Sequence, residues 1–226
     1  MLLAGLVSAL ILTQAPTDRW ACDLAPSLGV GSADEGDIDN FTSLSLGCRY
    51  ELFQVYGIGV SPTLTLDKQM WSVYEGGSQA KNIYGYDTQD YLFGLRFSRN
   101  LSEHTKIFYG FAAGFGTGSL ELTESTTQTS LNADYNGLTQ QLMTHTLGGS
   151  YGLTDRLALS LAWQRQDATQ KWNVTGSDIF VQNVDDNNSL TLTDGNSTSL
   201  TGSSFRSKNS TSVNSIQIGL SFSFGG

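Results

Sequence analysis

The sequence predicts an all-β protein in which eight antiparallel strands follow one another around a closed up-and-down barrel. Three observations predict this fold class. Bulky apolar residues alternate with small or polar residues in eight segments, and the clearest of these closes the chain at 216–224. The faces between the bulky residues consist mostly of glycine, serine, alanine and threonine, and the connections alternate between short and long. A period of two is that of an extended strand, not of a helix.

The eight segments are defined by the bulky residues that recur at every second position. In the first four segments these residues are Leu24, Pro26, Leu28 and Val30, then Leu44, Leu46, Tyr50 and Leu52, then Ile58, Val60, Leu64 and Leu66, then Tyr91, Phe93, Leu95 and Phe97. In the last four they are Ile107, Tyr109, Phe111, Ala113 and Phe115, then Met143, Leu147 and Tyr151, then Leu157, Leu159, Leu161 and Trp163, then Ile216, Ile218, Leu220, Phe222 and Phe224. Each segment therefore has one apolar face and one face of small side chains.

The small face decides which way the strands point. A soluble protein covers its outer surface with lysine and glutamate, whereas only 15% of this chain is charged. Small side chains suit the narrow interior of an eight-stranded barrel, which places the bulky face outward against hydrocarbon. The alternative is a soluble sandwich or lipocalin-like ligand binder. This alternative predicts that four bulky residues meet in a closed interior: Leu28, Phe93, Phe111 and Leu159.

The connections agree with a membrane barrel whose termini both lie on the periplasmic side. Short turns are predicted at 53–56, 99–105 and 152–156, and longer polar extracellular loops at 33–40, 74–88, 119–137 and 170–212. Aromatic rings favour the level of the lipid headgroups, which predicts two girdles. The predicted girdle residues are Tyr50, Tyr56, Phe97, Tyr109, Tyr151, Phe222 and Phe224 on the periplasmic side, and Trp163 and Trp71 on the other.

Two stretches resemble known proteins. The strand, tight turn and strand of 148–163, together with the closing strand that ends on two aromatic residues, resemble small bacterial outer-membrane barrels of the OmpA-like superfamily. That resemblance implies the outer membrane of a Gram-negative bacterium and contact with its lipid and lipopolysaccharide. It also implies insertion by the barrel assembly machinery, which reads the C-terminal aromatic residue. Here the Gly225-Gly226 tail leaves Phe224 third from the end.

The chain is expected to hold a signal peptide and one domain. Residues 1–15 form an apolar run of signal-peptide length, which ends at 21 at the latest, although no lysine or arginine precedes it. Residues 22–226 then form the barrel, with a long polar loop or hairpin extension at about 170–212. No segment after Ala15 is apolar enough for a transmembrane helix. A formal net charge of −9 argues against a nucleic-acid partner.

Two small groups of residues are candidate sites. Cys22 and Cys48 fall opposite each other if the first two strands form a hairpin, which favours a structural disulfide over two free thiols or a metal site. Arg49, Glu51 and Arg96 are the charges predicted to point into the lumen. Charges at membrane depth must pair, so we expect Glu51 between the two arginines. A selectivity constriction is the functional alternative for the same three residues.

The function predicted from these features is that of a non-catalytic, monomeric outer-membrane barrel with a structural, surface-interaction or narrow-pore role. We expect no cofactor, no metal site and no catalytic residue. A lipid-modifying enzyme remains an alternative through His145, which the alternation places near the lipid. In lipid A deacylase barrels a serine stands two residues after the lipid-facing histidine, and here that position is Leu147. No nucleophile and base can therefore be assembled locally.

Overall fold

A computed structural model describes residues 20–34, 36–76, 80–126, 130–171, 179–182 and 208–224. The predicted signal peptide, 1–15, lies outside these residues, and β1 begins at Trp20. In the described part of the chain no helix has the length and apolar character needed to cross a membrane.

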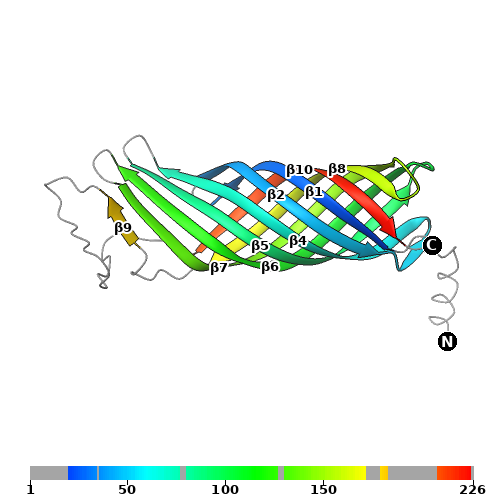
Figure 1. Cartoon of the computed structure of the whole chain (residues 1–226), viewed down its shortest axis with the longest axis horizontal. Coiled ribbons are helices and arrows are strands. Elements are labelled where there is room, and N and C mark those ends of the chain that lie inside the picture. Colours follow the sequence, from blue (N-terminus) through cyan, green and yellow to red (C-terminus); the bar gives the residue numbers. More distant parts are fainter. Residues whose placement is uncertain are drawn as a thin grey trace, which may run out of the picture.

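Eight long strands close into a ring, as the sequence predicted. They are β1 (Trp20–Ala33), β2 (Gly36–Tyr50), β4 (Ile58–Gly76), β5 (Ala80–Asn100), β6 (Thr105–Thr126), β7 (Ser130–Gly152), β8 (Leu157–Lys171) and β10 (Lys208–Phe224). Each pairs antiparallel with its neighbour in this order, and β10 pairs with β1 to complete the ring. Two short strands lie outside it: β3 (Phe53–Val55) extends the edge of β4, and β9 (Ile179–Gln182) pairs with β7. Figure 1 shows the tilted strands of this barrel.

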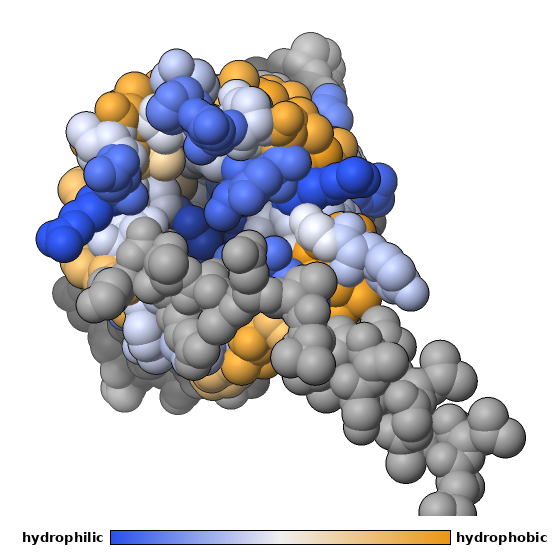
Figure 2. All heavy atoms as spheres, turned by 90° about the vertical axis from the view of Figure 1, so that its right-hand side faces the viewer, coloured by the Kyte–Doolittle hydropathy of each residue, from blue (hydrophilic) through white to orange (hydrophobic). Residues whose placement is uncertain are grey.

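The outward direction of the bulky side chains is also confirmed. Leu28, Phe93 and Leu159 are 69%, 59% and 44% exposed, and Phe111 is partly exposed. They do not meet in a closed interior, which excludes the sandwich alternative. Figure 2, a view onto the end where the chain terminates, shows hydrophilic residues around a hollowed centre and hydrophobic residues on the outer side. We call the outward apolar zone the belt. On β8 the belt ends between Trp163 and Arg165, and on β5 between Tyr91 and Gln89.

The strands are longer than the alternation predicted. The predicted loops 74–88 and 119–137 are largely ends of β4, β5, β6 and β7, which run on beyond the belt. The predicted turn 53–56 contains β3, and the hairpin closes at Tyr56 and Gly57, with φ of 51° and 75°. Positive φ at both central residues is the geometry of a tight type I′ turn. In the predicted loop 170–212, β8 reaches Lys171 and β10 begins at Lys208.

Beyond the belt the polarity of the wall is inverted, which is why these strand ends looked like loops. Outward positions there are polar, such as Lys68 and Asp87, which form an exposed ion pair. Inward positions become large and apolar, and together they form a buried cluster that we call the cap core. Its members are Ile38, Phe41, Trp71, Val73, Tyr84, Tyr86, Leu120, Leu138 and Val213. This end of the molecule is therefore packed like a soluble protein.

The predicted girdle residues fall into two groups. Phe97, Tyr109, Tyr151, Trp163, Phe222 and Phe224 are exposed on the outer face, as is Tyr56 in its turn, while Tyr50 is partly buried. Trp20 joins them, because its ring lies 4.9 Å from that of Tyr50. Trp71 was predicted for the outer girdle, and this is wrong. It points inward, is 3% exposed and stacks on Tyr86 with ring centroids 4.9 Å apart.

Candidate functional site

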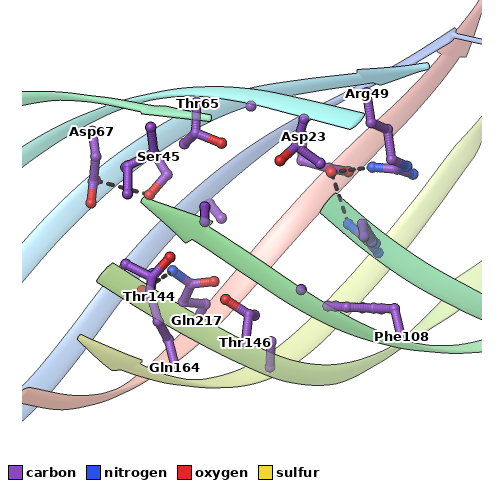
Figure 3. Close-up of a pocket in the computed structure, with 18 of the residues that line it drawn as sticks. Asp23, Ser45, Arg49, Thr65, Asp67, Phe108, Thr144, Thr146, Gln164 and Gln217 are labelled. Carbon is purple, nitrogen blue, oxygen red and sulfur yellow. Dashed lines mark hydrogen bonds and ion pairs between the residues drawn. The ribbon is translucent and has the colours of Figure 1, made fainter. Parts of the chain in front are cut away.

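Three charged side chains in the lumen near the chain termini are bonded to one another, and we call them the ion cluster. Asp23 on β1 accepts hydrogen bonds through one carboxylate oxygen from Arg49 on β2 and from Arg96 on β5, the latter at 3.1 Å. Arg49 also donates to Ser221 Oγ at 3.0 Å. The Arg96 guanidinium lies 3.5 Å from the ring centroid of Phe108, a cation–π contact that covers its other side. Figure 3 shows Asp23 and Arg49 side by side, joined by a dashed line.

The carboxylate of this cluster is not the one that the sequence indicated. Glu51 lies beyond the end of β2 and accepts a hydrogen bond from Gln54 Nε2 at 2.7 Å instead. β1 begins at Trp20, four residues before Leu24, where the predicted segment starts. Asp23 therefore belongs to the strand and lies between the two arginines. In the β1–β2 register Asp23 lies opposite Gly47, whose missing side chain leaves space beside it. Arg49 and Arg96 point into the lumen, where Asp23 and not Glu51 bridges them.

Above the ion cluster lies a cavity of about 130 Å³. Its walls carry hydroxyl and amide groups, among them Thr65, Thr144, Thr146, Gln164 and Gln217. Gln217 donates a hydrogen bond to Gln164 across its wall. At about 30 Å³ per water molecule this space holds about four waters, and a polar lining provides their partners. The cavity is thus a chamber inside the barrel whose walls are both polar and apolar, the latter including Leu92 and Phe108 (Figure 3).

A second set of side chains, which we call the polar layer, lies on the other side of the cavity. Its two carboxylates, Asp67 and Asp90, are opposite each other on β4 and β5 and are 2% and 0% exposed. Ser45 and Gln69 donate to Asp67 at 2.9 and 2.8 Å, and Gln140 donates to Asp90. Gln69 on β4 and Gln166 on β8 bond to each other across the lumen at 2.9 and 2.8 Å. Gln170 donates to Gln140 at 3.2 Å and to Thr211 at 2.9 Å on the two neighbouring strands.

One glycine makes room for this layer. A Cβ on Gly116 of β6 would lie 1.6 Å from Asp90 Oδ1, so a side chain at this position would displace the carboxylate. The inward glycines of β6 therefore set how much space the lumen offers to polar groups from the opposite strands.

Three layers of inward side chains follow one another along the strands. On β5, moving away from the chain termini, the inward residues are Arg96 of the ion cluster, then Asp90 of the polar layer, then Tyr86 of the cap core. The first level consists of partly buried ion pairs, the second of buried hydrogen-bonded groups and the third of buried apolar side chains. The cavity of about 130 Å³ lies between the first two of these layers.

The two cysteines form the predicted bond. Cys22 and Cys48 are directly opposite on β1 and β2 and are joined by a disulfide. They belong to the outward-facing set, and they lie next to Asp23 and Arg49 in the sequence. The bond therefore fixes the register of the hairpin that carries two members of the ion cluster.

His145 points outward, as predicted, and its surroundings are aromatic. Its Nδ1 lies 2.8 Å from Tyr109 Oη, and its ring centroid lies 5.2 Å from that of Phe111. The hydrogen bond satisfies a polar ring that faces the belt. His145 thus pairs with a tyrosine hydroxyl and not with a nucleophile.

An exposed polar group lies just beyond the belt on β8 and β10, and sequence reasoning did not identify it. Arg165 donates to both carboxylate oxygens of Asp167, at 3.2 and 3.3 Å, and Ser212 Oγ donates to the same carboxylate at 2.7 Å. The hydrogen bonds from Arg165 and then from Ser212 hold the pKa of the Asp167 carboxyl below its ordinary value. Arg165 and Asp167 lie two residues apart on β8, and this spacing places both side chains on the same face of the strand.

Comparisons with known proteins give likenesses of structure alone. No family model matches the chain, and no curated protein matches its sequence. Among solved structures it is similar to Ail, the attachment invasion locus protein of Yersinia pestis, with 12% identity and a TM-score of 0.46 over 92% of this chain and 100% of that one. It is also similar to Neisserial surface protein A (10%, 0.42, 91% and 97%) and to the outer membrane protein AlkL (13%, 0.39, 95% and 95%).

Proposed function

We propose that this chain is an integral outer-membrane protein of a Gram-negative bacterium whose barrel does not conduct, and that it acts through its cell-surface end without catalysis. It spans the membrane as a monomer, in contact with lipid and lipopolysaccharide, after insertion by the barrel assembly machinery. The observation that carries this proposal is the inversion of polarity along single strands. On β4, Leu66 faces outward and Asp67 inward, whereas four to six residues further on Trp71 and Val73 face inward.

The inversion is what two different solvents require. In hydrocarbon the apolar side chains must face outward, and in water they must face inward. Here the apolar side chains change from the outer to the inner face along the same strand. This change supports a boundary between lipid and water at the edge of the belt. The ends of β4, β5, β6 and β7 then stand in water at the cell surface, where they offer a polar wall to partners.

The closed lumen supports a surface role over a pore. Ion cluster, polar layer and cap core lie one behind another inside a barrel that eight strands make narrow. Passage along the axis requires all three to be displaced together.

Planar-bilayer recording tests this function. We expect purified protein reconstituted into a planar bilayer to give no steady conductance steps in 1 M KCl, because the three layers leave no aqueous path. The same preparation must migrate faster on a cold detergent gel than after boiling, which demonstrates a folded barrel. Stable ohmic steps from such heat-modifiable protein contradict a closed lumen, and loss of heat modifiability contradicts the membrane barrel itself.

A further inference from the structure

A furrow of about 910 Å³ runs across the outer face of the barrel from β6 to β1. One side of the furrow is a row of outward residues that pair directly from strand to strand: Ala113, Met143, Asp167, Ser212 and Ser32. The other side is the next row, which includes Phe115, Gln141 and Ser210. Several of these side chains are small, which leaves the depression open between rows of larger neighbours.

The furrow crosses the edge of the belt and changes in character as it does so. At its β6 end it is bordered by Phe93, Phe115 and Met143, which are 59%, 57% and 47% exposed and belong to the belt. At its β1 end it is bordered by Ser32 and Ser212, which lie two and four residues beyond the last apolar outward residues of their strands, Val30 and Ile216. The strands are tilted, so a row of paired residues climbs from hydrocarbon into the headgroup region.

The polar half of the furrow suits uncharged hydroxyl groups. Two carboxylates border it: Asp167 is paired with Arg165 and accepts a hydrogen bond from Ser212, and Asp34 accepts one from the Ser210 backbone N–H at 3.0 Å. Serine hydroxyls and the Gln141 amide are both donors and acceptors, the pattern that recognises sugar hydroxyls. The Arg165 guanidinium lies beside this half, where its outer edge can face a phosphate. Four strand spacings separate β6 from β1, so the furrow is about 19 Å long.

We propose that this furrow seats an outer-leaflet glycolipid. One acyl chain lies along Ala113, Met143 and Phe115, and the sugar part lies along Ser212 and Ser32. This inference rests on the proposed function, because it requires the β1 end to stand at the outer surface of the membrane. It adds a defined lipid site to a barrel whose interior is closed.

Native mass spectrometry tests the site with deep-rough lipopolysaccharide, a lipid A that carries few sugars. Barrels are released from phosphatidylcholine nanodiscs that contain this glycolipid or, in parallel, phosphatidylglycerol. We expect the wild-type chain to retain one glycolipid adduct and to prefer it over phosphatidylglycerol. Ala113→Trp fills the apolar half and Ser212→Trp fills the polar half, so each is expected to lower the adduct fraction at least fivefold.

Two variants serve as matched controls. Leu46→Trp places the same ring in the belt on β2, and Ser119→Trp places it on the polar outer wall of β6, both outside the furrow. These are expected to keep the wild-type adduct. Absence of an adduct from inserted wild-type barrels overturns the site, as does an equal loss in the control variants. Failure of the wild-type chain to enter nanodiscs as a heat-modifiable barrel overturns the proposed function instead.

Discussion

Replacement of Asp23 by asparagine is expected to lower the free energy of unfolding by about 3 kcal/mol. The change keeps the size of the side chain and removes the one carboxylate that Arg49 and Arg96 share. Removal of one partner from a buried ion pair costs about 3–5 kcal/mol, because it leaves uncompensated charge. The side chains of the ion cluster are 14% to 22% exposed, so we expect a loss of stability at the low end of that range. Urea titration of barrels folded in lipid vesicles measures it.

Glu51→Gln is the matched control for this prediction. Glu51 is the carboxylate that sequence reasoning placed between the arginines; it accepts a hydrogen bond from Gln54 and attracts the Lys106 ammonium. A partly exposed pair of this kind contributes at most about 1 kcal/mol, so the variant is expected to unfold close to the wild type. A larger loss for Glu51→Gln than for Asp23→Asn contradicts the assignment of Asp23.

Trp71→Ala is expected to destabilise the cap core by about 3–5 kcal/mol, the usual cost of deleting a buried tryptophan ring. Trp71 packs between Phe41, at a centroid distance of 6.1 Å, and Tyr86, at 4.9 Å, and lipid cannot enter to fill the space. The strand ends beyond the belt are expected to become sensitive to added protease. The sites of cleavage and the urea midpoint together measure this.

Trp163→Ala is the matched control for Trp71→Ala. It tests whether the loss of stability comes from the buried place of Trp71 in the cap core or from the removal of any tryptophan. Trp163 lies on the outer face of β8 and is 42% exposed, so acyl chains occupy the volume that its ring leaves. We expect a change of about 1 kcal/mol or less and no new protease site. Equal destabilisation by the two variants is incompatible with a cap core packed in water.

The barrel could be predicted from the sequence because the belt imposes a strict period of two. Leu159, Leu161 and Trp163 had to share one face of β8, and once that face was outward the strand count and order followed. The disulfide followed from the same register, because a hairpin between the first two strands places Cys22 against Cys48. These features depend on local pattern alone.

Other features depend on contacts between strands that are distant in the sequence, and the pattern could not supply them. Asp23 was overlooked because it lies before the first bulky residue of its strand, and its two arginines come from β2 and β5. Trp71 was assigned to a girdle because large apolar residues within the belt face outward. Beyond the belt they face inward, and the residue type alone does not distinguish the two cases. The polar outer ends of β5 and β6 resembled loops for the same reason.

The outward belt is tested most directly by spin labels on single cysteine variants in lipid vesicles. The labels replace Leu46, Phe93, Leu161 and Leu220 in the belt, and Asp87 and Ser119 beyond it. We expect collisions with oxygen, which dissolves in lipid, to exceed those with a water-soluble nickel chelate at the four belt positions, and the order to reverse at the other two. Greater exposure to the nickel chelate at the four belt positions would contradict a barrel that spans a membrane.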